Sequence, residues 1–541
     1  MYKVDRVASM LIATALTFGL FVQAAAVTIT VDGKTEHQVM EGIGGYGSIY
    51  PSHQKSADPV YTQQFINMLI NDMGASMIRI QVPPAFEVTN DNNDPSNTNL
   101  SNFNIDQIGS DGCKYRIRTI AQEVPYWKAL RQAAQANGED IRIIATMWSP
   151  PWWMKISNCV YGMVRSTCQL KSSARDELAE YCEAFVRIFK RETGFDLYAF
   201  SFQNEPDFVE PYQSCVYEGD TYVAAFEVIA NRFAQKGLSM RFFGPEDMAV
   251  RVNMNYGPEF MGSQAIQDHL HAYAVHGYSD GVAPTPNSQA ATVWRQVGGF
   301  ANATLGVPAW MTETSGQGKD WNGAMTKALA MGIAFYYGNV AVWTRWTWHD
   351  EVIQNGTTRK PQFAAYKHYA KWIRPGAVRI GTQFDGSDVL AVAFNHKQNK
   401  TLTVVIVNSG SSSTSCTITG DNLPSSYQAF QSKGAGEYAP SIGTVQPGNI
   451  SLPANSITTL YATGYEEDGQ VAVNQTHDLR RTLPTTAAGA LTAYGLDGRQ
   501  IRGTAGAATG RHAVRQRCRG IAVCRTGDGR TFKTAAGVLA R

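Results

Sequence analysis

The chain has 541 residues, of which 44% are hydrophobic, 11% aromatic and 17% charged. This apolar content excludes a disordered chain, and the length allows two or three domains, at least one with a large core. The 47 Lys and Arg residues nearly balance the 45 Asp and Glu residues, so the net charge of +2 argues against a dedicated nucleic-acid-binding protein. Residues 478–541 are different, because they contain 12 basic and only 3 acidic residues.

Residues 1–26 have the pattern of a secretory signal peptide. Lys3 and Arg6 form a basic start, an apolar stretch follows, and three alanines at 24–26 provide a cleavage site. An uncleaved membrane anchor is the alternative, but polar residues such as Ser9 and Gln23 interrupt the stretch. Since no later segment has 18 consecutive apolar residues, we expect a secreted protein, extracellular, periplasmic or at the cell surface. It should have no integral membrane segment once the signal is removed.

Eight cysteines fit an oxidising compartment but are too few for a disulfide scaffold in a chain of this length. Cys159 and Cys168 flank a short insert, and we predict a disulfide between them. Cys518 and Cys524 could close a loop in the tail, and Cys182 lies in a helical pattern as a buried free thiol. Neither CxxC nor HExxH spacing occurs, so the sequence predicts no zinc site.

Eight short, apolar, β-rich runs alternate with helical patterns between about residues 42 and 374. They lie at 42–46, 77–82, 142–147, 199–203, 241–244, 272–276, 309–312 and 341–346. Eight strands alternating with helices are typical of a (β/α)8 TIM barrel. An open doubly wound sheet is the alternative, but no phosphate-binding GxGxxG motif follows any of the runs.

An all-β region follows the barrel at residues 375–464. Its clearest strands are separated by polar turns and lie at 389–394, 402–407 and 457–461. Residues 27–41 are also strand-like, so they could pair into the same β-sandwich side domain. The sequence therefore predicts an α/β fold, a TIM barrel at 42–374 with an attached all-β sandwich.

The C-terminal part of the chain is different in composition. Residues 465–487 form a polar linker, and residues 488–541 form a small, basic, β-rich module. Within it, LTAYGLDGR at 491–499 is similar to the C-terminal β modules that bacterial secretion systems use as sorting signals. We expect contact with the cell surface or the secretion machinery, and a loosely folded basic extension is an equal alternative.

Two glutamates lie where a barrel would hold its active site, at the C-terminal ends of strands. Glu205 follows the fourth predicted strand and Glu313 follows the seventh. Because these strands face each other across the barrel mouth, both carboxylates can point into one cleft. A separation of about 5 Å suits retaining glycoside hydrolysis, whereas about 6.5–9.5 Å suits inversion. Any single Glu is usually solvated or ion-paired, but the spacing and aromatic surroundings favour a catalytic pair.

Tryptophans cluster near the same strand ends. Trp148 begins the segment WSPPWWM after the third strand, and Trp343, Trp346 and Trp348 lie at the eighth. Aromatic faces at a barrel mouth suit sugar rings. We predict that Trp148 and Trp346 line the cleft, whereas for Trp343 packing in the core is equally favoured.

Five short motifs occur in order along the barrel and its junction with the β region. They are QVMEGIGG at 38–45, WSPPWWMK at 148–155, QNEP at 203–206, MTE at 311–313 and WIRPGAVR at 372–379. This set resembles glycoside hydrolase family 30, and the resemblance extends from about residue 38 to residue 463. The NEP sequence alone is shared by many barrel glycosidases, but the five motifs together are specific.

The resemblance implies a barrel fused to a side β-sandwich that is built partly from the segment before the barrel. It also implies a retaining β-glycoside hydrolase, with Glu205 as general acid/base and Glu313 as nucleophile. Glu205 must hold a proton, so an apolar wall and the charge of Glu313 should raise its pKa, whereas Glu313 must be ionised. No metal and no organic cofactor is implied.

The resemblance further implies a set of substrate-binding residues. Arg79 should donate hydrogen bonds to the nucleophile, and Asn204 should bind the sugar 2-hydroxyl group. His276 and Tyr278 should lie beside the nucleophile, and Trp346 should form the floor of the catalytic subsite.

The substrate is less well defined than the chemistry. The segment EPYQSC at 210–215 is similar to one in xylan-active members, which favours an endo-acting enzyme on plant β-1,4-xylan. Glucuronoxylan-specific members carry paired arginines after strand eight, but here the segment is WTWHDE at 346–351, with Arg345 and Arg359 nearby. Dependence on glucuronic acid is therefore not expected. The alternatives are an endo-β-1,6-glucanase, a β-1,6-galactanase and a glucosylceramidase-like exo-glycosidase.

The expected partner is thus a polysaccharide or oligosaccharide substrate. A different class of function is a non-catalytic polysaccharide-binding protein that keeps the barrel. Loss of either Glu205 or Glu313 would favour that class, and both are present.

Overall fold

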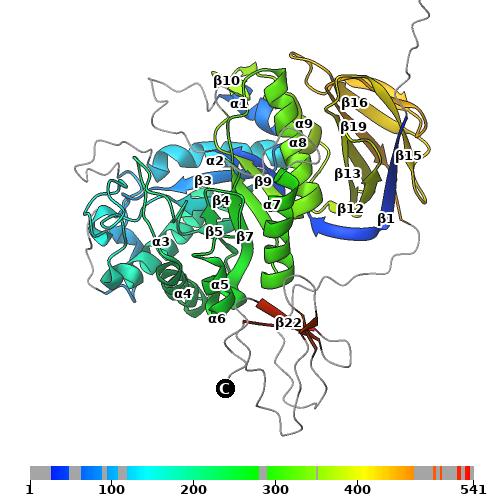
Figure 1. Cartoon of the computed structure of the whole chain (residues 1–541). Helices are drawn as coiled ribbons and strands as arrows, with labels where there is room; N and C mark the ends of the chain where they lie inside the picture. Colours follow the sequence, from blue (N-terminus) through cyan, green and yellow to red (C-terminus); the bar gives the residue numbers. More distant parts are fainter. Residues whose placement is uncertain are drawn as a thin grey trace, which may run out of the picture.

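The structure is a computed structural model. It describes residues 26–47, 62–87, 90, 94–107, 119–278, 289–348 and 351–467, together with four short strands between residues 492 and 535. The predicted signal peptide and most of the predicted linker lie outside the described residues. Figure 1 shows the barrel with its surrounding helices, and a β-sandwich beside it.

Eight parallel strands close into a barrel. They are β2 (Gly42–Tyr46), β3 (Met77–Val82), β4 (Arg142–Met147), β5 (Ala199–Ser201), β6 (Phe242–Asp247), β7 (Leu270–His276), β8 (Ala309–Glu313) and β9 (Val340–Arg345). Every predicted strand is present, and the pairing of β2 with β9 closes the sheet, so the barrel is confirmed over the open sheet. The largest boundary error is at β6, which continues through Pro245 to Asp247 instead of ending at Gly244.

Helices connect the strands and cover the outside of the barrel. They are α1 (Gln63–Ile66), α2 (Ile120–Ala136), α3 (Arg175–Thr193), α4 (Gly219–Gln235), α5 (Gly257–Gly262), α6 (Gln264–His269), α7 (Gln289–Gly298), α8 (Trp321–Gly338) and α9 (Gln362–Ala370). In α3, Asp176 and Glu177 lie in the first turn and Lys190 and Arg191 in the last, which suits the helix dipole. The predicted buried thiol of Cys182 is confirmed on this helix.

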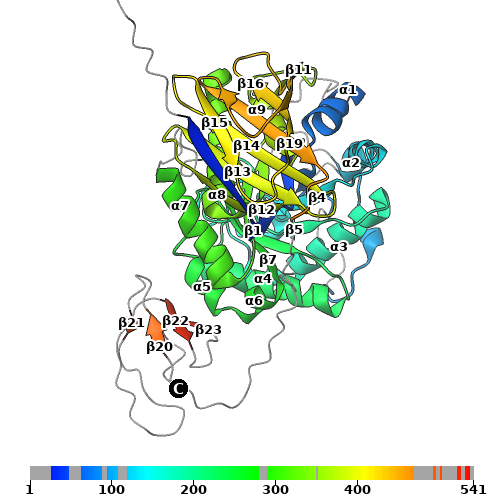
Figure 2. The ribbon, with the colours of Figure 1, turned by 90° about the vertical axis from the view of Figure 1, so that its right-hand side faces the viewer.

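The side domain is one nine-stranded sheet in the order β17-β16-β19-β14-β13-β12-β1-β15-β18. Its strands are β1 (Val27–Val39), β12 (Val378–Phe384), β13 (Val389–His396), β14 (Thr401–Asn408), β15 (Thr414–Thr419), β16 (Tyr427–Ser432), β17 (Ser441–Val445), β18 (Ile450–Leu452) and β19 (Ser456–Thr463). The segment before the barrel belongs to this sheet, as predicted, because β1 pairs with β12 and β15. Figure 2 shows β1, in blue, among the yellow and orange strands.

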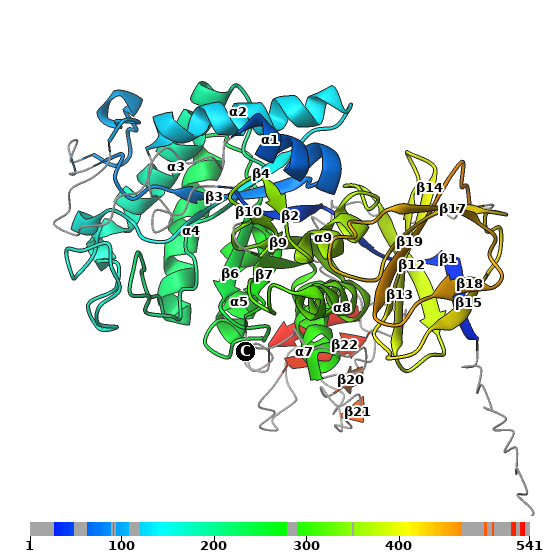
Figure 3. The same cartoon turned by 90° about the horizontal axis from the view of Figure 1, so that it is seen from above.

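The two domains pack through strands whose side chains alternate between two cores. On β13, Leu390 and Val392 belong to the barrel core, whereas Ala391 and Ala393 belong to the sandwich core. Because both faces of such a strand are covered, its sequence is a continuous apolar run. Figures 1 and 3 show α8 and α9 between the barrel and the sandwich.

Two smaller sheets complete the described structure. The hairpin of β10 (Ile353–Gln354) and β11 (Thr358–Arg359) follows the barrel. In the tail, an antiparallel sheet is formed by β20 (Thr492–Tyr494), β21 (Gln500–Ile501), β22 (Ile521–Arg525) and β23 (Thr531–Ala535). The side chains of the tail, including Cys518 and Cys524, lie outside the described part. Among the residues that are described, none of the helices could cross a membrane.

The predicted disulfide between Cys159 and Cys168 is wrong. Cys168 is a free, buried thiol whose Sγ lies 3.4 Å from the carbonyl oxygen of Ser214, and Cys159 is disulfide-bonded elsewhere. The two flanking segments pair through the bond from Ser157 N to Thr167 O, of 2.9 Å. Cys168 faces inward from this pairing, while Cys159 lies two residues beyond it, so sequence proximity did not bring the two thiols together.

Candidate active site

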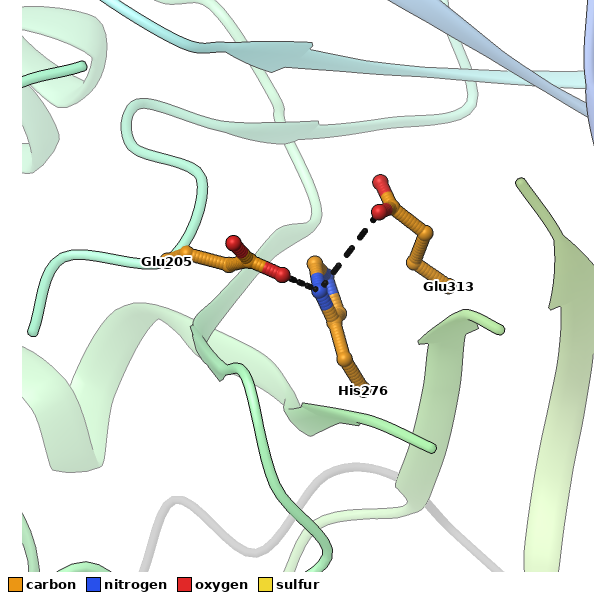
Figure 4. A group of neighbouring side chains, drawn as sticks. All are labelled: Glu205, His276 and Glu313. Atoms are coloured by element: carbon orange, nitrogen blue, oxygen red, sulfur yellow. Dashed lines mark hydrogen bonds and ion pairs between the residues drawn. The ribbon is translucent and has the colours of Figure 1, made fainter. Parts of the chain in front are cut away.

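Glu205, His276 and Glu313 meet at the C-terminal end of the barrel. Glu205 lies in the turn after β5, and the other two end β7 and β8. All three side chains are buried, and one ligand atom from each lies within 4.8 Å of the other two. Nδ1 of His276 is 2.8 Å from Oε1 of Glu205 and 4.0 Å from Oε1 of Glu313. Figure 4 shows the imidazole between the two carboxylates.

The backbone of Glu205 adopts an unusual conformation that directs its side chain. Its φ is +41°, which for a residue with a Cβ costs about 1–3 kcal/mol. Neighbouring hydrogen bonds hold the turn: Asn204 N donates to Met147 O at 2.7 Å, and Phe208 N donates to Glu205 O at 3.0 Å. Pro206 restricts the residue before it. Left-handed backbone of this kind is concentrated at functional sites.

Arg79, fully buried on β3, joins the residues of the site. It donates from Nη1 to Oε2 of Glu313, from Nη2 to Oδ1 of Asn204 at 2.6 Å and to Oε1 of Glu246 at 2.9 Å, and from Nε to Oγ1 of Thr146 at 3.2 Å. The structure thus brings Arg79 to Glu313, the contact that the resemblance implied.

His276 and Tyr278, which were predicted to lie together beside the nucleophile, contact different glutamates. The hydroxyl of Tyr278 donates to Oε1 of Glu313 at 2.5 Å, whereas His276 lies closer to Glu205. With Arg79 on Oε2, both oxygens of Glu313 have a donor. Burial raises the pKa of Glu313, but the positive charges of His276 and Arg79 oppose that rise. The pKa of Glu313 nevertheless stays above its ordinary value, because Arg79, His276 and Tyr278 favour the ionised carboxylate without outweighing burial and the charge of Glu205.

The pKa of Glu205 is lowered in the free site, whereas the sequence analysis expected it to be raised. Burial alone would raise it, but hydrogen bonds from His276 and Glu210 and the charge of Arg79 lower it below its ordinary value. Burial also disfavours the charged form of His276, yet the charge of Glu313 and the hydrogen bonds to Glu205 and Glu246 raise its pKa to about 9. His276 is therefore a cation at neutral pH. An apolar wall therefore does not dominate the surroundings of Glu205.

Glu246 is a site residue that the sequence analysis missed. It lies on β6, is buried, and has a φ of +61°. Its Oε1 accepts from Arg79 and lies 3.6 Å from Nε2 of His276. Burial would raise its pKa, but Arg79 and His276 lower it to about 2, so Glu246 is an anion that balances both cations. Its position at a strand end is the signal that also revealed Glu313.

Glu210 was also missed, although its segment was singled out. It is fully buried in the loop after β5, and its Oε1 accepts from Nδ2 of Asn204 at 3.0 Å. Burial, together with the charge of Glu205 and a hydrogen bond to it, raises the pKa of Glu210 well above its usual range. Asn204 therefore bridges Arg79 and Glu210, which fixes the orientation of its amide group.

Three aromatic rings line the site. The ring centroid of Trp346 lies 4.5 Å from that of Tyr46 and 5.7 Å from that of Trp148, and Arg79 lies 4.5 Å from the Trp148 ring. Trp346 is the most exposed of these three rings, so it can meet a sugar. Trp343 is instead fully buried against Trp294 and Phe335, which places it in the core.

The cluster of Glu205, His276 and Glu313 has the spacing of a metal site, but its atoms are already paired with one another and with Arg79. The guanidinium of Arg79 already forms an ion pair with the carboxylate of Glu313. The arrangement instead suits proton transfer by one glutamate and nucleophilic attack by the other.

Comparison with known proteins also indicates a glycoside hydrolase. Residues 376–460 match the family described as the glycosyl hydrolase family 30 beta sandwich domain. The chain is 23% identical over 454 residues to glucuronoxylanase XynC of Bacillus subtilis, covering 80% of this chain and 92% of that protein.

Solved structures show the same fold. A GH30 endoxylanase from Clostridium papyrosolvens aligns with a TM-score of 0.60 and 20% identity, covering 81% of this chain and all of the other. The endo-beta1,6-glucanase BT3312 aligns with a TM-score of 0.59 and 18% identity, covering 81% and 94%. The match over the sandwich domain, the shared two-domain fold and the five ordered motifs support glycoside hydrolase family 30 and a glycoside hydrolase activity.

Proposed function

We propose that the protein is a secreted, retaining β-glycanase that cleaves polysaccharide by double displacement, with β-1,4-xylan as the first candidate substrate. One observation carries the retaining mechanism: oxygens of Glu205 and Glu313 lie within 4.8 Å of each other. Carboxyl groups about 5–5.5 Å apart suit direct attack by one of them, whereas inversion requires about 6.5–9.5 Å for a water molecule.

In the first step Glu313 attacks the anomeric carbon while Glu205 protonates the departing glycosidic oxygen. Arg79 and Tyr278 hold the attacking carboxylate in one orientation. Asn204 is fixed by Arg79 and Glu210, so its amide can bind the sugar 2-hydroxyl without reorganising. The step ends with a glycosyl ester on Glu313 and a free leaving group.

In the second step Glu205 is the base. It removes a proton from a water molecule that attacks the anomeric carbon, and the ester bond to Glu313 breaks. Two displacements at one carbon restore the original anomeric configuration. His276, hydrogen-bonded to Glu205, stabilises its ionised form between the two steps.

Xylan is favoured by the similarity to XynC and to the GH30 endoxylanase. The rings of Tyr46, Trp148 and Trp346 provide apolar faces for pyranose rings at the site. The main alternative is a β-1,6-linked glucan, because the endo-β-1,6-glucanase has the same fold at a similar TM-score.

A requirement for glucuronic acid side groups is not part of the proposal. Arg345 is buried, and its three nitrogens donate to the carbonyl oxygen of Thr347, to Gln362 and to Glu351. Arg359 is paired with Asp72 on the barrel surface. Both guanidinium groups already have a carboxylate partner, so neutral xylan should be cleaved as well as glucuronoxylan.

Secretion rests on the sequence of residues 1–26. Expression of the full chain in a bacterial host, followed by N-terminal sequencing of the exported protein, tests it. A mature terminus near residue 27 supports secretion. Retention of the full-length chain in the cytoplasm contradicts it.

The substrate is tested by incubating the purified protein separately with xylan, glucuronoxylan, β-1,6-glucan and β-1,6-galactan. Mass spectrometry should detect short oligomers from xylan and glucuronoxylan, and none with the Glu313→Gln variant. Monosaccharide alone would indicate an exo-acting enzyme. Binding to a polymer without any product would favour the non-catalytic polysaccharide-binding protein.

A further inference from the structure

Thr314 directly follows the nucleophile and is hydrogen-bonded to the strand ends on both sides of it. It is fully buried, and its carbonyl oxygen accepts from the backbone N of Trp346, after β9, at 2.8 Å. Its hydroxyl donates to the carbonyl oxygen of Gly277, after β7, also at 2.8 Å. The backbone N of Gly277 in turn donates to the carbonyl oxygen of Glu313 at 2.8 Å. The two displacement steps leave Thr314 without a role, although it contacts the segments that carry the nucleophile and the exposed ring of Trp346.

The side-chain bond of Thr314 lies where the regular pairing of β7 with β8 is interrupted. Val275 of β7 pairs with Met311 of β8. The next residue of β7, His276, pairs with Glu313, so the ladder skips one residue of β8. Irregularities of this kind are common next to active sites, where they redirect side chains and end regular pairing. Beyond this one, the hydroxyl of Thr314 supplies a bond between two strands whose ladder has lost its regular spacing.

Lys327 on α8 fixes the direction of that hydroxyl. Its side chain is fully buried, and its Nζ lies 3.4 Å from Oγ1 of Thr314 and 5.9 Å from the centre of the Trp343 ring. The carbonyl oxygen of Gly277 can only accept, so the single hydroxyl proton of Thr314 points to it. Nζ of Lys327 is therefore the donor to Oγ1. With a donor on one side and an acceptor on the other, the hydroxyl has one orientation.

We propose that Thr314 is a positioning residue that aligns the hydroxyl of Tyr278 on the nucleophile. Tyr278 follows Gly277, so the bond from Thr314 holds the peptide group that joins these two residues. Without this bond the peptide group can rotate. The hydroxyl of Tyr278, which donates to Oε1 of Glu313 at 2.5 Å, then loses its alignment. The inference rests on the proposed role of Glu313 as nucleophile, and it gives Thr314 an effect on the attack by that carboxylate.

The test is a double-mutant cycle that combines Thr314→Val with Tyr278→Phe. Val has nearly the shape of Thr but no hydroxyl, and Phe removes the donor through which Thr314 acts. The readout is kcat/KM for 2,4-dinitrophenyl β-xylobioside, whose leaving group departs without a proton, so the value reports the attack by the nucleophile. Thr314→Val alone should lower kcat/KM at least about tenfold. In the Tyr278→Phe background it should cost less than about threefold, because the group that Thr314 aligns is already missing.

Two further variants separate positioning from a general loss of structure. Thr314→Ser keeps the hydroxyl and should restore kcat/KM to within about threefold of the wild type. Thr326→Val is the matched control, because Oγ1 of Thr326, exposed on α8, also donates to a carbonyl oxygen, that of Asn322 at 2.9 Å. It should behave as the wild type. Thermal unfolding of each variant checks that it folds.

A full tenfold loss from Thr314→Val in the Tyr278→Phe background would overturn the proposal, because a purely structural effect adds to the loss from Tyr278→Phe. A Thr314→Ser variant as slow as Thr314→Val would also overturn it. If Thr314→Val does not fold, Lys327→Met repeats the cycle and leaves the chain at β8 unchanged. It should lower kcat/KM about threefold in the wild type and not in Tyr278→Phe, and equal losses in both backgrounds would overturn the proposal.

Failure of the proposed function gives a different result. If the wild type does not cleave the xylobioside, the assignment of xylan fails, and the cycle is measured on whichever of the four polysaccharides the enzyme cleaves. Hydrolysis retained by Glu313→Gln would refute the nucleophile itself. Additive losses in an enzyme that depends on Glu313 would refute only the role of Thr314.

Discussion

Arg79 and Glu313 form a buried ion pair, although 234 residues separate them in the sequence. The pair joins the second and seventh strands of the barrel across its mouth. Arg79 also binds Asn204 and Glu246, so one side chain sets the positions of three others. This shared partner makes the site a unit in which the effect of one substitution depends on the rest.

Arg79→Lys should lower kcat by at least about a hundredfold, because an ammonium group cannot donate to Glu313, Asn204 and Glu246 in the same geometry. The measurement is kcat on xylan, with thermal unfolding to check that the variant folds. Arg131→Lys, which alters an exposed ion pair with Asp140, should behave as the wild type. A normal kcat for Arg79→Lys would refute its role in positioning the nucleophile.

Glu313→Gln should abolish nearly all turnover and keep substrate binding, because the nucleophile acts only in the chemical step. Isothermal titration with a xylo-oligosaccharide measures the binding, and reducing-sugar release measures the turnover. Substantial residual hydrolysis in a preparation free of wild-type enzyme would remove Glu313 from the mechanism.

Glu205→Ala should slow the cleavage of a poor leaving group far more than that of a good one, which departs without a proton. The comparison is between phenyl and 2,4-dinitrophenyl β-xylobiosides at one pH. A loss of the same size on both glycosides would contradict the acid role of Glu205.

His368 should make the junction between the domains sensitive to acid. Nδ1 lies 2.8 Å from Oγ1 of Thr459 and Nε2 lies 3.0 Å from Oγ of Ser432, so the ring is held between α9 and the sandwich. Burial, with a smaller effect from Lys367, lowers its pKa to about 3. The unfolded chain binds this proton near pH 6.5, so the stabilisation is complete above that pH. It is lost as the pH falls towards 3.

The expected loss is up to about 1.4 kcal/mol of unfolding free energy per pH unit below about 6.5. Urea unfolding of the wild type and of His368→Gln over this range measures it. The variant should be less stable at neutral pH and show a shallower fall with acid. Parallel slopes for the wild type and His368→Gln would contradict the prediction.

The sequence predicted the fold well because its signals are local. Eight apolar runs alternating with helical patterns defined the barrel, and Glu205 and Glu313 could be recognised because active sites lie at strand ends. The same rule would have found Glu246 if β6 had been expected to continue through Pro245.

The remaining features depend on contacts between distant segments. Glu210 reaches Asn204 only because the loop after β5 folds it there, and the lowered pKa of Glu205 depends on His276, which lies on another strand. Trp343 and Trp346 are three residues apart, yet one packs into the core and the other lies at the site. The wrong cysteine pairing has the same origin, since nearness in sequence does not fix the direction of a side chain.

In the proposed mechanism Glu313 attacks the anomeric carbon directly, with Glu205 as acid and then base. Proton NMR of the anomeric region during the first minutes of xylan hydrolysis tests it, before mutarotation mixes the anomers. With double displacement, β-anomeric reducing ends should appear first, and α-anomers should follow by mutarotation. Initial release of the α-anomer would show inversion and would contradict the proposed roles of both glutamates.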